Sequence, residues 1–507
     1  MSITGPGSIT AANLLAQNNM SSQLNTLSEE LGTGQAAQTY YGLGSQAGVA
    51  LALSAQLSAI NGYSATATTV GTTLSIAQSA LNQIGGVGSA VQQAVNEQGA
   101  FSLDNSGQTP TQESAASYLD QILSLLNTQV GDSYIFSGSA VNQPSVASTD
   151  EILNGNGAQA GLTQVIAQRA QADGVGAQGR LLIPAVAGGS STVTVSQDAA
   201  GSPFGFQLTG VNSSLTGATV TGPSGTSPPS ISVDLGSNPN PGDSISFELT
   251  LPDGSTQTIT LQATANSPAG ANQFTIGANA DGTAANLQAA LSTAVTNLAA
   301  TALPASSAIA AANNFFSDPP QLVDAGAPPD YATATSLMNG TSANAVFWYT
   351  GENGSTPALQ TATAQVGPSM TIAYGMRANE PAFASLLANV GALAATSFSA
   401  SDPNAPASYQ ALCQSVVANL SGQPGAQTVS DIEADLANAQ TIVKNATSTN
   451  TQTQTTLQDM LQGIEGINQN QIGEDLLTLQ NNLSASMSVT ARLAQLSLVN
   501  YLAPVSG

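Results

Sequence analysis

The chain begins with apolar residues spaced three or four positions apart, which is the spacing of one face of an α-helix. Two glycines, Gly32 and Gly34, follow this stretch and predict its end, because glycine is favoured just after a helix. The predicted face consists of Ala12, Ala16, Met20, Leu24, Leu27 and Leu31.

A second and longer series runs from Leu53 to Val95, mostly in alternating steps of four and three. Such alternation over about six heptads is typical of a coiled-coil seam, in which a narrow stripe contacts a partner helix. The stripe includes Ala, Ser and Gly, which permit close approach but bury little apolar area. Its members are Leu53, Leu57, Ile60, Ser64, Ala67, Val70, Leu74, Ala77, Leu81, Ile84, Gly88, Val91 and Val95.

A third helix is predicted to begin after Thr109, which is a favourable N-cap residue. Pro110 fits the first helical position, and Gln112 completes a capping box with the threonine. The predicted buried face of this helix comprises Ala115, Leu119, Ile122, Leu126 and Val130.

The C-terminal part of the chain repeats the helical pattern with two further faces. The uncharged stretch at 445–456 lies between them and either continues one helix or interrupts it. The first face consists of Ile432, Leu436, Ala439 and Val443. The second consists of Leu476, Leu479, Leu483, Met487, Ala491, Ala494, Leu498 and Leu502.

Between about 181 and 364 the apolar residues alternate with polar ones, as in half-buried β-strands. The clearest prediction is a hairpin around the turn Pro-Asp-Gly-Ser at 252–255. Further strands are predicted in the stretches STVTVSQ, FGFQLTG and ISVDLG. A helix capped by Asp281 or Thr283 should follow, with one side formed by Leu287, Leu291, Val295 and Leu298.

These patterns predict a mainly α protein with an α+β insert, in which long antiparallel coiled-coil-like helices come from both termini. An ordinary helical bundle is the alternative, but the series from 53 to 95 is longer than a typical globular helix. The expected parts are an N-terminal helical rod (1–140), a connecting segment (141–180), a variable, β-rich outer α+β domain (181–364) and a C-terminal helical rod that pairs with the first (365–507).

The composition excludes several classes of function. Charged residues make up 7% of the 507 residues, against about 25% in an average soluble protein, and the net charge is −24. Five scattered cations cannot form the clustered basic surface that binds nucleic acid or an anionic membrane. These cations are Arg169, Arg180, Arg377, Lys444 and Arg492.

No catalytic, cofactor or metal site is predicted, and we expect no enzyme. The chain has no His, and its one Cys allows neither an internal disulfide nor a Cys-rich metal site. Cys413 lies in a helical pattern and is interpreted as a small buried residue. The stretch TGENGS at 350–355 is interpreted as a turn, and Glu380 before Pro381 as a helix start.

The N-terminal stretch has neither a positively charged region nor a continuous apolar core, so no cleavable signal peptide is predicted. No run approaches 18 consecutive apolar residues, and we expect no membrane-spanning segment. The protein is therefore expected to be cytosolic or to leave the cell without a cleaved signal.

Five stretches, taken in their order, resemble the bacterial flagellin family, whose members build the flagellar filament and its junction with the hook. LNTLSEELGTGQ (24–35) resembles the N-terminal signature of the family, and SYIFSGS (133–139) resembles the segment that ends its N-terminal helices. AYGMRANEPAFASLLANVGALAA (373–395) resembles a segment before the C-terminal helices of some members, and NNLSASMSVTARLAQLSLVNYL (481–502) resembles the C-terminal helix of the family. GDSISFELTLPDGSTQTITLQA resembles a domain inserted in some members. The resemblance is closest to the hook-associated protein 3 type, the junction subunit.

The resemblance implies a self-assembling structural subunit of the flagellum that contributes to motility. In the family the terminal helices pack as coiled coils lining an inner tube, and the middle domain projects outward. The implied partners are other copies of the chain, hook-associated proteins, flagellin and an export chaperone. The implied route is unfolded export through the flagellar type III channel, and the implied location is the extracellular flagellum.

The predicted assembly residues lie on the faces of the terminal helices. Filament and junction roles both fit these helices. The alternative function is that of a secreted adhesin or surface-layer binding module, with the β-rich insert as its working part. The assembly residues are Leu24, Leu27, Leu31, Leu476, Leu479, Leu483, Leu498 and Leu502.

Overall fold

Two units, each assembled from segments far apart in sequence, make up the chain in the computed structural model. The structure describes residues 6–97, 99–105, 107–223, 227–422 and 424–501. The first unit combines the two ends of the chain and consists of residues 1–71, 364–372 and 441–507. The second unit consists of residues 72–363 and 373–440.

Long helices and one short hairpin form the first unit. Helix α1 ends at Thr33, and Gly34 follows it with a φ of +73°, a conformation that favours glycine. Helices α2 and α9 contribute residues to both units. The elements are α1 (Pro6–Thr33), the 3-10 helix η1 (Tyr40–Gln46), α2 (Ala47–Asn96), β13 (Thr363–Gly367), β14 (Met370–Ala373), α9 (Val429–Glu465) and α10 (Gln469–Tyr501).

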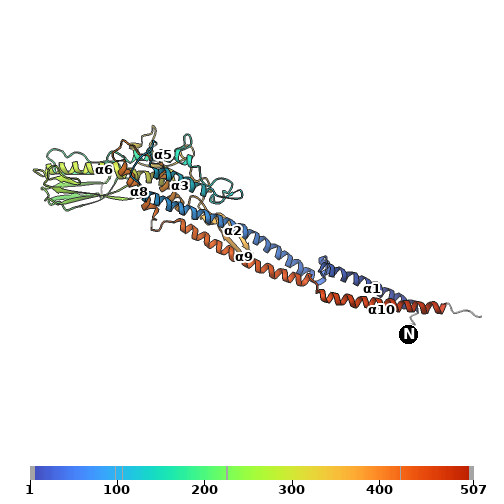
Figure 1. The fold of residues 1–507 in the computed structure, drawn as a ribbon. Helices are drawn as coiled ribbons and strands as arrows, with labels where there is room; N and C mark the ends of the chain where they lie inside the picture. Colours follow the sequence, from blue (N-terminus) through green and yellow to red (C-terminus); the bar gives the residue numbers. More distant parts are fainter. Residues whose placement is uncertain (1–5, 98, 106, 224–226, 423, 502–507) are drawn as a thin grey trace, which may run out of the picture. The chain divides into compact units, whose positions relative to one another are not determined.

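The long stripe predicted in α2 is confirmed, because every one of its positions is half-buried or buried. The parts of α2 and α9 that belong to the first unit run side by side (Figure 1). Within the first unit, a Cβ added to Gly71 would lie 3.4 Å from a methyl group of Val443, so the two helices pack closely there. The predicted face of α9 is also confirmed, since its four members are buried: Ile432, Leu436, Ala439 and Val443.

The uncharged stretch at 445–456 continues α9 without a break. Its threonine hydroxyls donate to the carbonyl four residues earlier, as Thr447 does to Val443, and are thereby satisfied within the helix. Asn450 is buried, and its amide donates to the carbonyl of Val366 in β13 at 2.9 Å. This hydrogen bond therefore attaches the β13–β14 hairpin to α9.

The helical part of the second unit begins with the predicted capping box. The Thr109 hydroxyl accepts from the Gln112 N–H, and the Gln112 side chain accepts from the Thr109 N–H at 3.0 Å. The face predicted for this helix ends at Leu126, and Val130 lies in a short strand instead. The elements are α3 (Pro110–Leu126), β1 (Gln129–Val130), β2 (Ser133–Tyr134), α4 (Thr149–Asn154), α5 (Leu162–Ala172), α6 (Ala280–Phe315), β11 (Gln321–Val323), η2 (Tyr331–Thr333), β12 (Leu337–Asn339), η3 (Ala358–Thr361), α7 (Pro381–Ala395) and α8 (Ala405–Leu420).

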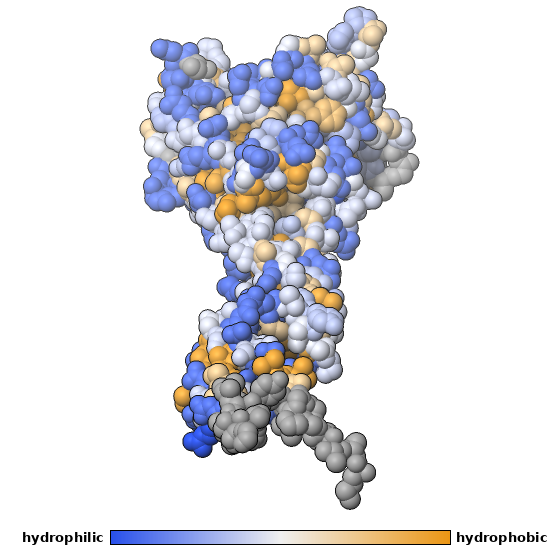
Figure 2. All heavy atoms as spheres, turned by 90° about the vertical axis from the view of Figure 1, so that its right-hand side faces the viewer, coloured by the Kyte–Doolittle hydropathy of each residue, from blue (hydrophilic) through white to orange (hydrophobic). Residues whose placement is uncertain are grey.

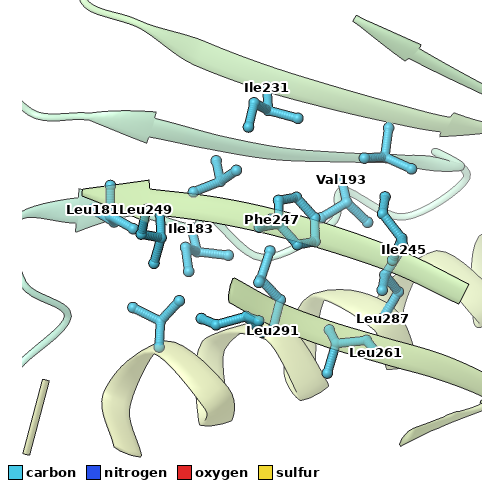
Figure 3. Close-up of a cluster of buried hydrophobic side chains, with 14 of the residues drawn as sticks. Leu181, Ile183, Val193, Ile231, Ile245, Phe247, Leu249, Leu261, Leu287 and Leu291 are labelled. Carbon is cyan, nitrogen blue, oxygen red and sulfur yellow. The ribbon is translucent and has the colours of Figure 1, made fainter. Parts of the chain in front are cut away.

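Two four-stranded sheets and the first turns of α6 enclose one apolar core (Figure 3). The strand orders are β3-β4-β7-β6 and β10-β9-β8-β5, with all pairs antiparallel except β10–β9. The predicted hairpin is confirmed by the pairing of Ile245 with Leu261 and of Phe247 with Ile259. The strands are β3 (Leu181–Leu182), β4 (Thr192–Gln197), β5 (Gln207–Ser213), β6 (Ala218–Thr221), β7 (Ser230–Leu235), β8 (Ser244–Thr250), β9 (Thr256–Thr264) and β10 (Gln273–Thr275).

The cap predicted for α6 is wrong. Asn279, rather than Asp281 or Thr283, caps the helix by accepting from the Gly282 N–H at 3.0 Å. The helix also continues through Pro304 to Phe315, because its alanine-rich second half is buried against α7 and α8. Packing of this kind outweighs the helix-breaking tendency of one proline. The predicted side of the helix is correct, with Leu287, Leu291 and Val295 buried and Leu298 half-buried.

Two segments, Tyr40–Asn96 and Ala280–Phe315, are long and apolar enough by length and composition to cross a membrane. In α6 the most apolar window is 56% buried, as expected of the core helix of a folded domain. In α2 the most apolar window is largely exposed, and its buried side chains form one stripe, the pattern of a helix that packs on a protein partner.

Three separated segments of the second unit meet around Arg377. The guanidinium of Arg377 is buried, pairs with the Glu352 carboxylate at 2.9 Å and donates to the carbonyl of Gly354 at 2.7 Å. Backbone bridging joins Arg377 to Ser137. The N–H of Ser139 donates to Glu352 and, together with Arg377, lowers the pKa of that carboxyl. The stretch at 350–355, predicted to be a turn, thus contributes Glu352 and the Gly354 carbonyl to the contacts of the buried Arg377 side chain.

Aromatic packing reinforces the same junction. Phe136 is buried against Phe383 of α7, with ring centroids 6.0 Å apart in an edge-to-face arrangement. The N–H of Ala378 donates to the Phe136 carbonyl at 2.8 Å. Glu380 is the N-cap of α7, and Pro381 is its first residue, as predicted. The stretches SYIFSGS and AYGMRANEPAF therefore contact each other directly.

Replacing Gln112 with alanine should destabilise the second unit by about 3 kcal/mol. The Gln112 amide donates to the carbonyls of Leu393 and Thr396, and its oxygen accepts from Thr109, so the change leaves three buried polar groups unsatisfied. Urea unfolding followed by the fluorescence of Trp348, which is fully buried in this unit, measures the loss. Gln121→Ala is the matched control, because Gln121 is exposed on the same helix. Equal effects of the two variants would contradict the prediction.

The stability of the second unit should depend on the ionisation of Glu380. Burial raises the pKa of this carboxyl above its ordinary value of 4.5, against the opposing effect of a hydrogen bond from Gln427. The native state therefore binds the proton more tightly than the unfolded chain does. The unfolding free energy of the natural chain, minus that of Glu380→Gln, should fall as the pH rises from 4.5 through the raised pKa. A difference that stays constant with pH would show that burial of the carboxylate is not the cause.

Candidate assembly surface

Helices α1 and α10 lie side by side and antiparallel (Figure 1). Near the end of α1, the Ala36 N–H donates to the Glu465 carbonyl at 2.7 Å. Near its beginning, the Gln17 amide donates to the Thr490 hydroxyl at 3.0 Å. Residue numbers thus rise along α1 as they fall along α10, and the two ends of the chain form one helical pair.

One stripe on each of these helices is half-buried, and we call the two stripes together the terminal seam. Its positions alternate mostly by three and four, which is the spacing of a coiled coil. On α1 the terminal seam comprises Asn13, Gln17, Met20, Leu24, Leu27 and Glu30. On α10 it comprises Ile472, Leu476, Leu479, Leu483, Ser486, Thr490 and Leu493.

Most of the predicted assembly residues fall in the terminal seam, but not all of them. Leu31 is outside it and is 39% exposed. The side chain of Leu498 and the whole of Leu502 lie outside the described residues. The five that the structure brings together in the seam are Leu24, Leu27, Leu476, Leu479 and Leu483.

The helical faces predicted from the apolar spacing are wrong at the outer end of each helix. The prediction followed apolar residues at steps of four, whereas the helices pair with the average 3.5-residue period of a coiled coil. Polar residues therefore occupy seam positions at this end. The apolar pattern wrongly assigned these positions to the residues beside them. At this outer end the residues predicted to be buried that are exposed instead are Ala12, Ala16, Met487, Ala491 and Ala494, and Leu31 is exposed at the other end of α1.

Hydrogen bonds replace apolar contact at this outer end of the seam. The Gln17 amide donates to Thr490 and lies 3.5 Å from the Ser486 hydroxyl. A polar pair inside a seam of this kind fixes the register of the two helices, because a shifted pairing would leave the polar groups without partners. Apolar patterns cannot reveal such residues. Continuing the three–four alternation outward from Leu24 and Leu483, whatever the residue type, would have found them.

Large apolar side chains remain exposed on both helices away from the terminal seam. Leu15 of α1 is 66% exposed, and Leu477 of α10 is 62% exposed. Figure 2 shows apolar residues, coloured orange, at the surface in the lower part of the view. Exposed leucines at this density are typical of a surface that another protein covers. The exposed set comprises Leu14, Leu15, Leu31, Leu477, Met487 and Val489.

A second exposed apolar group lies where η1 joins α2. Tyr41 is 95% exposed, and its neighbour Tyr40 shares a hydrogen bond of 3.2 Å with the Ser54 hydroxyl. Val49 and Leu51, on the first turns of α2, are exposed as well. An aromatic side chain that is almost wholly in solvent contributes nothing to the stability of its own chain but suits an interface.

Charge and metal chemistry contribute little to these surfaces. Among the described residues no group of three or more Cys, Asp and Glu side chains could hold a metal ion. Cys413 is buried in α8, as interpreted, and burial raises the pKa of its thiol to about 11. Three arginines are used inside the second unit, where ion pairs join Arg169 to Asp173, Arg180 to Asp198 and Arg377 to Glu352.

Residues 8–141 match the family model of the bacterial flagellin N-terminal helical region. The match covers most of α1, all of η1, α2 and α3, and the β1–β2 strands. It supports the bacterial flagellin family, which is a family of structural proteins and not of enzymes. No curated protein matches the chain.

The flagellin match and the terminal seam concern the same helix. Helix α1 lies in the matched segment, and the helix that covers its seam, α10, comes from the opposite end of the chain. The match therefore supports a flagellar structural subunit, and the geometry identifies which side chains hold its terminal helices together.

Leu479→Ala should loosen the pair of terminal helices. Truncating a half-buried leucine in the seam should cost about 1.4 kcal/mol, less than the full cost in a closed core. Amide hydrogen exchange in α1 and α10 of the monomer should then become about tenfold faster.

Leu477→Ala serves as the control, because Leu477 is two residues away on the same helix and is exposed. It should leave the exchange rates of the monomer nearly unchanged. If the two variants exchanged equally fast, the assigned phase of the seam would be wrong.

Proposed function

We propose that the chain is a self-assembling structural subunit of the bacterial flagellar axial structure. The pairing of α1 with α10 supports this most directly, because it joins the segment that matches flagellin to the opposite chain end and still leaves exposed leucines on both helices. The function of these surfaces is then to bind neighbouring copies.

Assembly follows from the nature of such a surface. A contact is heterologous when one face of the helical pair binds a different face of the pair in the next copy. Repeated heterologous contacts that do not close into a ring build an open helical polymer. Half-buried terminal helices gain the burial that they lack in the monomer once neighbours cover them. In this proposal the rods at 1–140 and 365–507 form the inner core of the polymer, the segment 141–180 connects, and the domain at 181–364 projects outward.

The proposed assembly residues comprise those in the terminal seam and those beside it. Seam residues hold the pair together, and the exposed leucines contact the next copy. Leu31 belongs to the second group by its exposure. The side chains of Leu498 and Leu502 are proposed as interface residues from the sequence pattern alone. The full set is Leu24, Leu27, Leu31, Leu476, Leu479, Leu483, Leu498 and Leu502.

More specifically, we propose that the chain is of the hook-associated protein 3 type, a subunit of the hook–filament junction. The alternative location of the chain is the filament itself. The motifs at 133–139 and 373–395 support this assignment, since the two segments contact each other around Arg377 within the chain. Export through the flagellar type III channel with a chaperone, and an extracellular location on the flagellum, belong to the same proposal. Immunogold labelling distinguishes the two positions: a band at the hook tip indicates the junction, and label along the length indicates the filament.

Two charge substitutions should separate pairing from assembly. Leu27→Asp places a carboxylate in the terminal seam and should disrupt both the α1–α10 pair and polymer growth. Leu477→Asp changes an exposed side chain and should leave the pair intact but block growth, because the carboxylate would be buried against the next copy. Seeded polymerisation, followed by electron microscopy, measures growth, and hydrogen exchange measures pairing.

Thr163→Asp is the control for added charge. Thr163 is exposed in the first turn of α5, where an acidic side chain is compatible with the helix dipole. This variant should polymerise like the natural chain. Normal polymer growth by Leu477→Asp would refute the proposed role of the exposed leucines.

A further inference from the structure

A cleft of about 260 Å³ opens in the second unit between helix α5 and the segment that follows strand β11. The polar residues of its lining come from α5 and from the segments around it: Gln164, Gln168, Asp324, Tyr331 and Asn344. Its volume is below the range of about 300–1,000 Å³ typical of drug-sized ligands, so it suits one small ring rather than an extended chain.

The two glutamine amides of this cleft lack hydrogen-bond partners within the described part of the chain. Gln164 and Gln168 lie one turn apart on α5, and no protein group in that part bonds to either side chain. The Asn344 oxygen accepts from the N–H and hydroxyl of Thr341, which fixes the amide while leaving its N–H donors available. Three amides with open hydrogen-bonding capacity thus converge on one space.

A neighbouring cleft shows the contrast. Asn127, Glu151 and Gln159 also line a hollow, but their side chains are engaged in the protein: Asn127 with 145–146, Glu151 with the cap of α4, and Gln159 with the Ser342 carbonyl. The polar groups of that cleft hold loops together. In the α5 cleft the Gln164 and Gln168 amides make no such contact within the described residues, so they are open to a ligand.

The other side of the α5 cleft is apolar and firmly supported. Leu322 and Val323 of β11 are buried beneath it, and Met338 pairs with Leu322 across the β11–β12 strands. Tyr331 lines the cleft and packs against a small core cluster that includes Phe204. The ring of Tyr331 is therefore held in place before any ligand binds.

We propose that the α5 cleft binds a single uncharged sugar ring, either free or at the end of a glycan. A pyranose has an apolar C–H face, which suits the tyrosine and the aliphatic residues, and hydroxyl groups at its edge, which suit amides that both donate and accept. An apolar ligand would leave the three amides unpaired, at a cost in free energy.

Charge excludes anionic ligands from the same space. No cation lines the cleft, and the Asp324 carboxylate does. The two nearest arginines in the chain sequence are already engaged, since Arg169 pairs with Asp173, while Arg180 pairs with Asp198 and donates to the carbonyls of Ala332 and Ala334. Phosphate groups and acidic sugars need such cations for tight binding. The proposed specificity is therefore for neutral sugars, and it does not depend on the assembly function.

Saturation-transfer NMR with the purified full chain tests the proposal. The probes are the methyl pyranosides of glucose, galactose, mannose and N-acetylglucosamine, the neutral trisaccharide of each, and glucuronic and sialic acids as anionic probes. At least one neutral probe should bind saturably with a Kd of about 1 mM, as a small ligand with few contacts does. The acids should give no saturable signal. Tighter binding of the trisaccharide would identify a glycan end as the natural source, and equal binding would identify the free sugar.

Gln164→Ala and Gln168→Ala should each weaken this binding at least tenfold. Both glutamines lie on the outer face of α5, so their loss should not unfold the unit, and unchanged Trp348 fluorescence verifies this. Gln171→Ala is the matched control, because Gln171 is exposed on the same helix and does not line the cleft. No saturable neutral probe, or equal binding by all three variants and the natural chain, would overturn the proposal.

Discussion

One narrow stripe of half-buried side chains holds α1 against α10, and the order of both chain ends depends on it. Two helices in contact along one stripe bury little apolar area, so the pair is only marginally stable by itself. Where Gln17 and Thr490 take the place of apolar residues, their hydrogen bond mainly fixes the register of the two helices. It adds little stability, since such a hydrogen bond contributes about 1 kcal/mol net. A defined register with weak closure suits segments that gain full order from neighbouring copies.

The second unit is held together in the opposite way, by buried groups that cannot be separated without loss. The Arg377 guanidinium must keep Glu352 and the Gly354 carbonyl as partners, because an unpaired buried charge is far more costly than an exposed one. Its backbone bridges to Ser137, so the N-terminal and C-terminal segments of this unit are ordered together. One chain therefore contains a unit that is stabilised by buried groups and a unit whose terminal helices are held by a half-buried stripe. This combination suits assembly from monomers.

The sequence predicted best those features that depend on local chemistry. The capping box of Thr109 and Gln112, the stripe in α2 and the hairpin of β8 and β9 each rest on neighbouring residues with one favourable conformation. The phase of α10 beyond Leu483 could not be predicted from its apolar residues, because the partner helix, and not the apolar residues of α10, selects Ser486 and Thr490 for the seam. The extension of α6 through Pro304 likewise depends on burial by α7 and α8, which lie far along the chain.

The scarcity of cations constrains how copies of this chain can recognise each other. Three of the five cations form ion pairs inside the second unit. Because the net charge is −24, approaching copies repel each other at long range. At physiological ionic strength this repulsion is screened beyond about 8 Å, and contact then depends on apolar area and hydrogen bonds. Ion pairs can contribute little to the specificity of the interface. Specificity must come from the shape of the leucine-bearing helices and from amide and hydroxyl groups, as it already does where Gln17 meets Thr490 within a single chain.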